Sequence, residues 1–189
     1  HEFLTHLGAS PGFYIPDRYK EGYGVSMAGM EYAIANSIQL IIAMDCGVNA
    51  RAQVAKAKEH SIGFIICDHH LPDGPLPTAD AVLDPMILDC PYPFKGLSGC
   101  GVAFKLAQAF LRKNNLPEEK LHPLLDLLAL SIAADIVPMV GENRTLAHFG
   151  LKAINETERP GLLALLELSG RQRPLSISDV VFGLAPLIN

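Results

Sequence analysis

Three side chains that can bind a metal ion or move a proton stand side by side at Asp68, His69 and His70. They follow a short apolar run, residues 63–67, which is typical of a buried parallel strand. In open α/β sheets, ligands bind at the carboxyl ends of the strands. Because neighbouring side chains in a strand point to opposite faces, Asp68, His69 and His70 cannot all be core residues. The alternative is a loop that holds two histidines by chance.

Two further carboxylates stand at the ends of apolar segments. Asp45 follows the preceding apolar run, residues 39–44. Adjacent parallel strands lie about 4.8 Å apart, so Asp45 and the histidines converge on one pocket if the two strands are neighbours. Asp135 ends a long apolar helix, where the helix dipole disfavours a negative charge. A nearby cation would resolve this conflict; the alternative is a solvated helix end.

These side chains form a set of candidate metal ligands without sulfur: Asp45, Asp68, His69, His70 and Asp135. Such ligands suit Mn²⁺ or Mg²⁺ better than a structural zinc ion. Two such ions, about 3.5–4 Å apart, activate water and clamp a phosphoryl group during in-line displacement. Asp45, between two strand ends, is the candidate for a bridging ligand. The set is small for two ions, so we expect a further acidic pair from a strand before Phe13, outside this chain.

The remaining pattern predicts an α/β fold. Residues 1–8 read as the end of a helix, and the strands expected are 12–15, 39–44, 63–67 and 81–83. The helices expected are one that begins after Ser26 as N-cap, then 50–60, 99–113, 117–134, 144–155, 160–168 and 176–184. Alternating strands and helices predict a parallel, Rossmann-like sheet flanked by helices and followed by an all-helical segment. We expect residues 1–113 to form the α/β part and residues 114–189 the helical part of one catalytic core.

The composition limits the class of protein. The chain has 189 residues, 49% of them hydrophobic, and a net charge of −5, which argues against a large nucleic-acid-binding surface. No apolar run approaches the roughly 20 residues of a membrane span, and the first residues do not resemble a signal peptide. The four cysteines form no Cys-x-x-Cys pair, so a zinc knuckle is not expected. A reduced, cytoplasmic protein is the simplest interpretation.

Several motifs occur in the order found in one known family. They are Ile15-Pro16-Asp17-Arg18, Glu21-Gly22-Tyr23-Gly24, Asp68-His69-His70-Leu71-Pro72, Leu97-x-Gly99-x-Gly101-Val102-Ala103-Phe104, Ala134-Asp135-Ile136-Val137-Pro138 and Glu142-Asn143-Arg144. Together with Asp45 on the preceding strand, they resemble the RecJ branch of the DHH phosphoesterase superfamily. Members of this branch are single-strand-specific 5′-to-3′ DNA exonucleases that act in repair and recombination and use Mn²⁺ or Mg²⁺.

The resemblance implies a role for each site residue. The implied metal ligands are Asp45, as the bridge, His69 and Asp135; the implied catalytic residues are Asp68, which orients an imidazole, and His70, which contacts the scissile phosphate. The implied substrate contacts are Arg18 to a phosphate and, more weakly, Asn143 and Arg144 to nucleic acid. The implied partners are single-stranded DNA and replication or repair proteins such as a single-strand-binding protein.

The chain also departs from the family pattern. The first strand with its Asp-x-Asp motif is missing, as are the C-terminal substrate-binding domain and the nucleic-acid-binding β-barrel. Only Asn189 remains of what looks like an Asn-Ala-Ala-Gly-Arg motif. We therefore expect an excised piece of an enzyme that is inactive by itself.

Three other functions remain open. A DHH phosphoesterase acting on short oligonucleotides, nucleotides or pyrophosphate differs in domains outside this chain. A non-catalytic replication scaffold would not need Asp45, His69, His70 and Asp135, and metal titration would distinguish it. A dinucleotide-binding domain is disfavoured because no Gly-x-Gly-x-x-Gly follows a strand.

Overall fold

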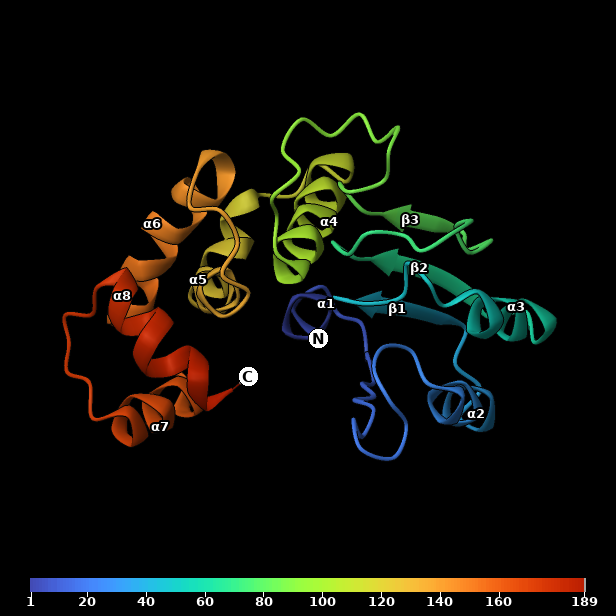
Figure 1. The fold of residues 1–189 in the computed structure, drawn as a ribbon, viewed down its shortest axis with the longest axis horizontal. Coiled ribbons are helices and arrows are strands. Elements are labelled where there is room, and N and C mark those ends of the chain that lie inside the picture. The colour runs from blue at the N-terminus through green and yellow to red at the C-terminus, as the bar shows by residue number, and fades with distance from the viewer. Residues whose placement is uncertain (189) are drawn as a thin grey trace. The chain divides into compact units, whose positions relative to one another are not determined.

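The computed structural model describes residues 1–188, so the expected motif residue Asn189 lies outside the described residues. The chain divides into two compact units, His1–Pro93 and Phe94–Asn189 (Figure 1). The second unit begins before α4 (Gly99–Lys113), which the sequence interpretation had grouped with the sheet. The expectation that residues 1–113 and 114–189 are two parts of one catalytic core stays a prediction.

The first unit is built on a parallel sheet of three strands in the order β1-β2-β3. Its elements are α1 (Glu2–His6), α2 (Met27–Ala35), β1 (Leu40–Met44), α3 (Arg51–Glu59), β2 (Gly63–Cys67) and β3 (Ala81–Leu83). Met44 pairs with Cys67, and Cys67 pairs with Leu83, so all three strands end at one edge. The prediction of a parallel α/β sheet with converging strand ends is confirmed.

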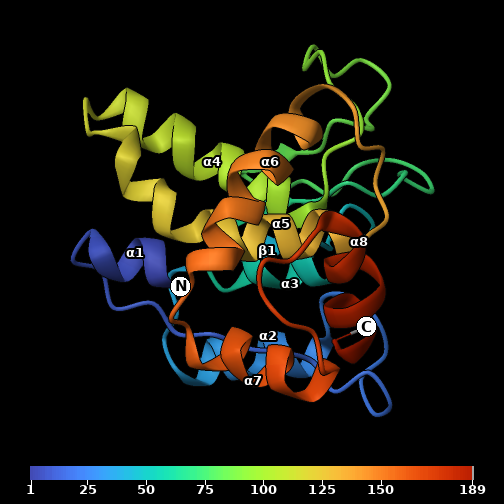
Figure 2. The same ribbon diagram turned by 90° about the vertical axis from the view of Figure 1, so that its left-hand side faces the viewer.

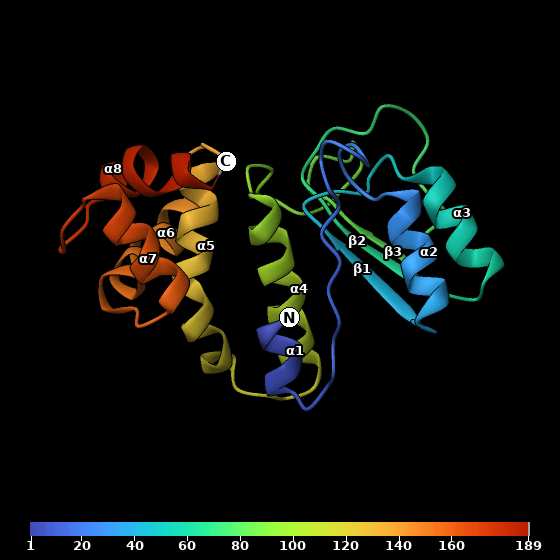
Figure 3. The ribbon, with the colours of Figure 1, turned by 90° about the horizontal axis from the view of Figure 1, so that it is seen from below.

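Helices α2 and α3 lie on one face of this sheet (Figure 3). Met30 and Val54 point from the helices into a core that includes Phe64 and Ile66 of the central strand. Ser26 begins α2 as predicted, because its Oγ accepts the Gly29 N–H at 2.9 Å. Apolar side chains on both sides of β2 explain why residues 63–67 form a continuous hydrophobic run.

The strand expected at residues 12–15 is not formed, and this prediction is wrong. The segment is irregular, and the side chains of Phe13 and Ile15 are 73% and 81% exposed. A strand exists only where a neighbour satisfies its N–H and C=O groups, and no described strand pairs with this segment. The apolar composition of residues 12–15 is therefore not enough to make them a strand.

The second unit is helical (Figure 2). Besides α4, it contains the 3₁₀ helix Glu118–Leu124, α5 (Leu125–Ala134), α6 (Gly141–Glu156), α7 (Pro160–Ser169), α8 (Ile177–Asp179), a π turn (Val180–Leu184) and a 3₁₀ turn (Ala185–Leu187). The single helix expected over residues 117–134 is broken, because Pro123 lacks an N–H and its ring crowds the preceding turn. Residues 176–184, expected as one helix, divide into α8 and the π turn.

Helices α5 and α6 pack at close range around Gly150. A Cβ at Gly150 would overlap the Leu125 carbonyl oxygen and the Ala129 side chain, so only glycine fits this crossing. Ala129 and Ile154 are fully buried there in a core shared with α7 and the π turn. This packing fixes the end of α5, where Asp135 lies. No helix among residues 1–188 is long and apolar enough to cross a membrane.

Candidate metal centre

Asp45 lies where β1 ends and turns away from the sheet. Its N–H still donates to the Cys67 carbonyl at 2.8 Å, which extends the parallel pairing by one residue. Its own φ is +62°, in the left-handed region that aspartate tolerates better than most residues. The chain therefore leaves the sheet at Asp45, and the carboxylate remains 54% exposed at the edge.

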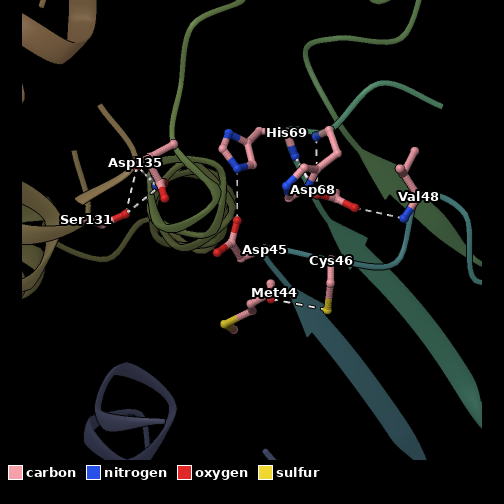
Figure 4. Close-up of polar contacts among 11 residues, drawn as sticks. Met44, Asp45, Cys46, Val48, Asp68, His69, Ser131 and Asp135 are labelled. Atoms are coloured by element: carbon pink, nitrogen blue, oxygen red, sulfur yellow. Dashed lines mark hydrogen bonds and ion pairs between the residues drawn. The ribbon is translucent and has the colours of Figure 1, made fainter. Parts of the chain in front are cut away.

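His69 faces Asp45 from the end of the neighbouring strand (Figure 4). Its Nε2 lies 3.0 Å from Asp45 Oδ1, and the imidazole is largely buried. Donor atoms at adjacent positions of one octahedral ion, each about 2.1 Å from it, are themselves about 3 Å apart. The spacing of this oxygen and nitrogen therefore fits two ligands of one Mn²⁺ or Mg²⁺ ion.

The buried carboxylate of Asp68 accepts several hydrogen bonds at this edge of the sheet. Its Oδ2 accepts the Val48 N–H at 2.9 Å, and its Oδ1 accepts the backbone N–H groups of His69 and His70 at 2.8 and 3.3 Å. The side chain is only 2% exposed. Burial opposes ionisation, but the hydrogen bonds from Val48, His70 and His69 outweigh it and lower the pKa of Asp68. Asp68 is therefore a charged acceptor that shapes the loop carrying both histidines.

His70 is held by Asp68 through its ring. Its Nδ1 lies 2.6 Å from Asp68 Oδ1, so a proton on Nδ1 leaves Nε2 as the free atom. The side chain is 58% exposed and packs edge-on against the His69 ring at 4.5 Å between centroids. Ligand atoms of Asp45, His69 and His70 all lie within 4.8 Å of one another. Three residues could therefore hold one ion here. The sequence analysis assigned only Asp45 and His69 of these as metal ligands, so His70 is an additional candidate.

Asp84 is a buried acid at this edge that the sequence analysis did not assign to the site. It follows β3 at the same sheet edge and is 3% exposed. Its Oδ1 accepts the Met86 N–H at 2.8 Å, whereas its Oδ2 is buried without a hydrogen-bond partner. Burial raises the pKa of Asp84, and the nearby charge of Asp68 raises it further. The hydrogen bond from the Met86 N–H lowers the pKa but does not outweigh these two effects. The signal was present, because a third strand also ends in an acid.

Asp135 lies in the second unit, directly after α5. Its N–H donates to the Ser131 carbonyl at 2.9 Å, and its Oδ2 lies 3.5 Å from Ser131 Oγ (Figure 4). The side chain is half-buried. Its assignment as a metal ligand stays a prediction.

The predicted substrate residues differ in exposure. Arg18 is exposed, with its guanidinium carbon 4.4 Å from the centroid of the Tyr23 ring, and Arg144 is exposed on α6. Asn143 is fully buried, and its Nδ2 donates to two backbone carbonyls. The prediction that Asn143 contacts nucleic acid is therefore wrong, because its amide is neither accessible nor free to donate.

Comparison with known proteins gives a consistent family. Residues 1–132 match the DHH family, N-terminal domain. The chain is 42% identical over 188 residues to the single-stranded-DNA-specific exonuclease RecJ of Salmonella typhimurium, with 94% of this chain and 33% of the relative covered. It is 43% identical over 187 residues to the protein of the same name from Bacillus subtilis, with 98% and 23% covered. The chain thus spans a third or less of these relatives.

Solved structures show the same fold. A crystal structure of exonuclease RecJ bound to manganese has a TM-score of 0.87 at 32% identity and covers 100% of this chain and 47% of that one. The structure of RecJ in complex with Mn²⁺ from Thermus thermophilus has a TM-score of 0.78 at 29% identity, with 99% and 26% covered.

Proposed function

This chain belongs to the DHH family, and we propose that it carries part of the active centre of a RecJ-type, single-stranded-DNA-specific 5′-to-3′ exonuclease. The observation that carries the proposal is the cluster of Asp45, His69 and His70 at the sheet edge. Two relatives named single-stranded-DNA-specific exonuclease RecJ are 42% and 43% identical to this chain, and two solved RecJ structures hold manganese. The proposed cofactor is accordingly Mn²⁺ or Mg²⁺.

The cluster divides the work among its residues. Asp45 and His69 would hold the metal ion, which would supply an activated water and stabilise charge on the phosphate. Asp68 fixes the orientation of His70 by accepting the proton of Nδ1 in a hydrogen bond. In its imidazolium form, in which both ring nitrogens carry a proton, His70 would donate from Nε2 to a non-bridging oxygen of the scissile phosphate. A donor aimed at such an oxygen contributes about 10²–10³ in rate.

Arg18 is the proposed contact to a second phosphate of the strand. Its loop is ordered around Glu21, which accepts hydrogen bonds from the Ser26 hydroxyl at 2.5 Å and the Asp17 N–H at 2.8 Å. Stacking on Tyr23 holds the guanidinium in an exposed position with its donors available. A planar fork of donors suits a phosphate, and Arg144 is proposed as a weaker contact.

Asp135 is proposed as a further ligand of the same centre. It follows the last turn of α5, where a carboxylate without a cation is disfavoured by the helix dipole. Single-stranded DNA is the proposed substrate, and a single-strand-binding protein is a candidate partner because it acts on the same strand. The four cysteines form no disulfide in the described part of the chain, which fits the proposed cytoplasmic location.

Metal binding and nuclease activity of the full-length protein test this proposal. We expect Asp45→Ala and His69→Ala to weaken Mn²⁺ binding, measured by calorimetry, and to abolish release of nucleotides from 5′ ends. His70→Ala should retain more metal binding than His69→Ala, while its turnover falls about 10²–10³-fold. His60→Ala is the matched control, because His60 is an exposed imidazole after α3, which precedes the opposite end of β2.

The outcomes separate the alternatives. Equal losses of Mn²⁺ affinity for the two histidine variants would refute the division of roles between them. A full-length protein that binds neither Mn²⁺ nor Mg²⁺ would favour the non-catalytic scaffold. Turnover of dinucleotides without turnover of long strands would identify a short-oligonucleotide phosphoesterase.

A further inference from the structure

The backbone immediately after Asp135 is strained. Ile136 has a φ of +51°, a conformation that a β-branched residue rarely adopts. Its side chain is 80% exposed, so packing of the isoleucine itself does not explain the conformation. Strained backbone persists only where surrounding contacts fix it, and such sites concentrate where function requires a defined geometry.

Asn143 provides two of these contacts from the first turn of α6. Its Nδ2 donates to the Pro138 carbonyl at 3.0 Å and to the Gly96 carbonyl at 2.5 Å. One amide group thus ties the turn after Asp135 to the segment that precedes α4. The Phe94 ring packs against Gly141, where φ is +53° and an added Cβ would lie 2.9 Å from the ring.

The Asp135 side of the turn is attached to the same segment. Ser131 Oγ lies 3.1 Å from Ser98 Oγ, and Ser98 Oγ accepts the Gly101 N–H at the start of α4. The Ser131 carbonyl also accepts the Asp135 N–H. The residues on both sides of Ile136 are therefore fixed to residues 96–98, by Ser131 before the turn and by Asn143 after it.

We propose that Asn143 is a positioning residue for Asp135, which it holds in place through the turn at residues 136–138. This inference rests on the proposed function, in which Asp135 is a metal ligand. Asn143 donates both of its observed bonds to backbone carbonyls, and its Oδ1 is buried without a partner. A side chain that contacts only backbone here acts on the geometry of the chain and not on the substrate. This replaces the nucleic-acid contact expected from the sequence.

The same helix offers a matched control in Asn155. Its Nδ2 also donates to two backbone carbonyls, of Leu151 at 3.0 Å and Leu175 at 3.1 Å, and its Oδ1 accepts the Leu175 N–H at 2.6 Å. Asn155 lies about 18 Å further along the helix axis than Asn143, at about 1.5 Å per residue. It anchors the segment that precedes α8, so its loss removes similar hydrogen bonds without touching the Asp135 turn.

The experiment compares Asn143→Ala, Asn155→Ala and Asp135→Ala in the full-length protein. Mn²⁺ affinity is measured by calorimetry, amide hydrogen exchange reports the turn at residues 135–140, and urea unfolding reports stability. We expect Asn143→Ala to weaken Mn²⁺ binding about 10–100-fold and to accelerate exchange at the turn. Asn155→Ala should lose comparable stability while its Mn²⁺ affinity and the exchange at the turn stay unchanged. Asn143→Ser, which keeps one donor, should give intermediate values and serves if the alanine variant does not fold.

One result would refute the positioning role of Asn143, and another would refute the assignment of Asp135 as a metal ligand. If Asn143→Ala and Asn155→Ala change exchange at the turn and Mn²⁺ affinity equally, Asn143 is a general structural residue and the inference is wrong. If Asp135→Ala binds Mn²⁺ as tightly as the unmodified protein, the ligand assignment in the proposed function is wrong. In that case the exchange data alone decide whether Asn143 positions the turn.

Discussion

Replacement of Asp68 by asparagine changes one oxygen of the most heavily hydrogen-bonded carboxylate at the sheet edge. Oδ1 accepts the N–H groups of His69 and His70 and contacts the His70 ring, while Oδ2 accepts the Val48 N–H. Asparagine has only one acceptor oxygen, which can replace Oδ1. Its NH₂ group then faces the Val48 N–H, so two donors oppose each other at a buried position.

The expected destabilisation follows from these contacts. A hydrogen bond to a charged group contributes about 1.5–3 kcal/mol, and a buried N–H without a partner costs about 1–3 kcal/mol. The three bonds that remain also lose the strengthening that a negative charge gives them. We therefore expect Asp68→Asn to lower the free energy of unfolding by about 3 kcal/mol, a large part of the roughly 5–15 kcal/mol that stabilises a typical domain.

Urea unfolding followed by circular dichroism measures this change. Asp80→Asn is the control, because the Asp80 carboxylate accepts a single backbone bond, from Phe64 N–H at 2.7 Å, and an amide oxygen can replace it. We expect the control to change stability by under about 1 kcal/mol. A loss below about 1 kcal/mol in Asp68→Asn, or equal losses in both variants, would refute the reasoning.

Other expected outcomes concern the helical unit, a thiol and the metal. Asp126→Ala leaves Arg159 without its ion-pair partner, whose Oδ2 lies 2.8 Å from the Arg159 Nε, and should cost about 3–5 kcal/mol in urea unfolding. Glu118→Ala, at a solvent-exposed pair with Arg112, should lose much less stability because exposed pairs are weak, and similar losses for the two variants would contradict this. Burial, then the charges of Asp68 and Asp45, raise the pKa of Cys46 to about 11, so its alkylation at pH 8 should be about 100-fold slower than that of a peptide thiol. Mass spectrometry measures that rate, and an equal rate would contradict the prediction. Mn²⁺ at about 100 times its Kd should stabilise the protein by about 2.7 kcal/mol in thermal unfolding, and a chelator should reverse this; an unchanged transition would argue against the site.

Local sequence determined most of the elements. The runs at residues 63–67 and 81–83 became strands with the predicted bounds, and α4 spans the predicted residues 99–113. These segments carry their own signals, because a buried strand needs a continuous apolar run and Ser98 caps the helix with its side chain. The converging side chains of Asp45 and His69 follow from the same logic, since parallel strands end at one edge.

The sequence also contains two signals that predict features of the structure, a helix break at Pro123 and an acid at a strand end at Asp84. Pro123 interrupts the apolar pattern of residues 117–134, and a proline in the interior of a helix removes a backbone hydrogen bond. Asp84 follows β3 as Asp45 follows β1, so the rule that found one acid could have found the other.

Only the tertiary structure decided which polar groups are exposed and which backbone segments are paired. Phe13 and Ile15 have strand-like side chains, but a strand requires a neighbouring chain to satisfy its backbone groups. Asn143 and Arg144 are adjacent in one motif, yet one is fully buried on Gly96 and Pro138 and the other is exposed. Local sequence sets the periodicity of a helix, but burial depends on segments as far away as Gly96, 47 residues before Asn143, because packing brings them together only in the folded chain.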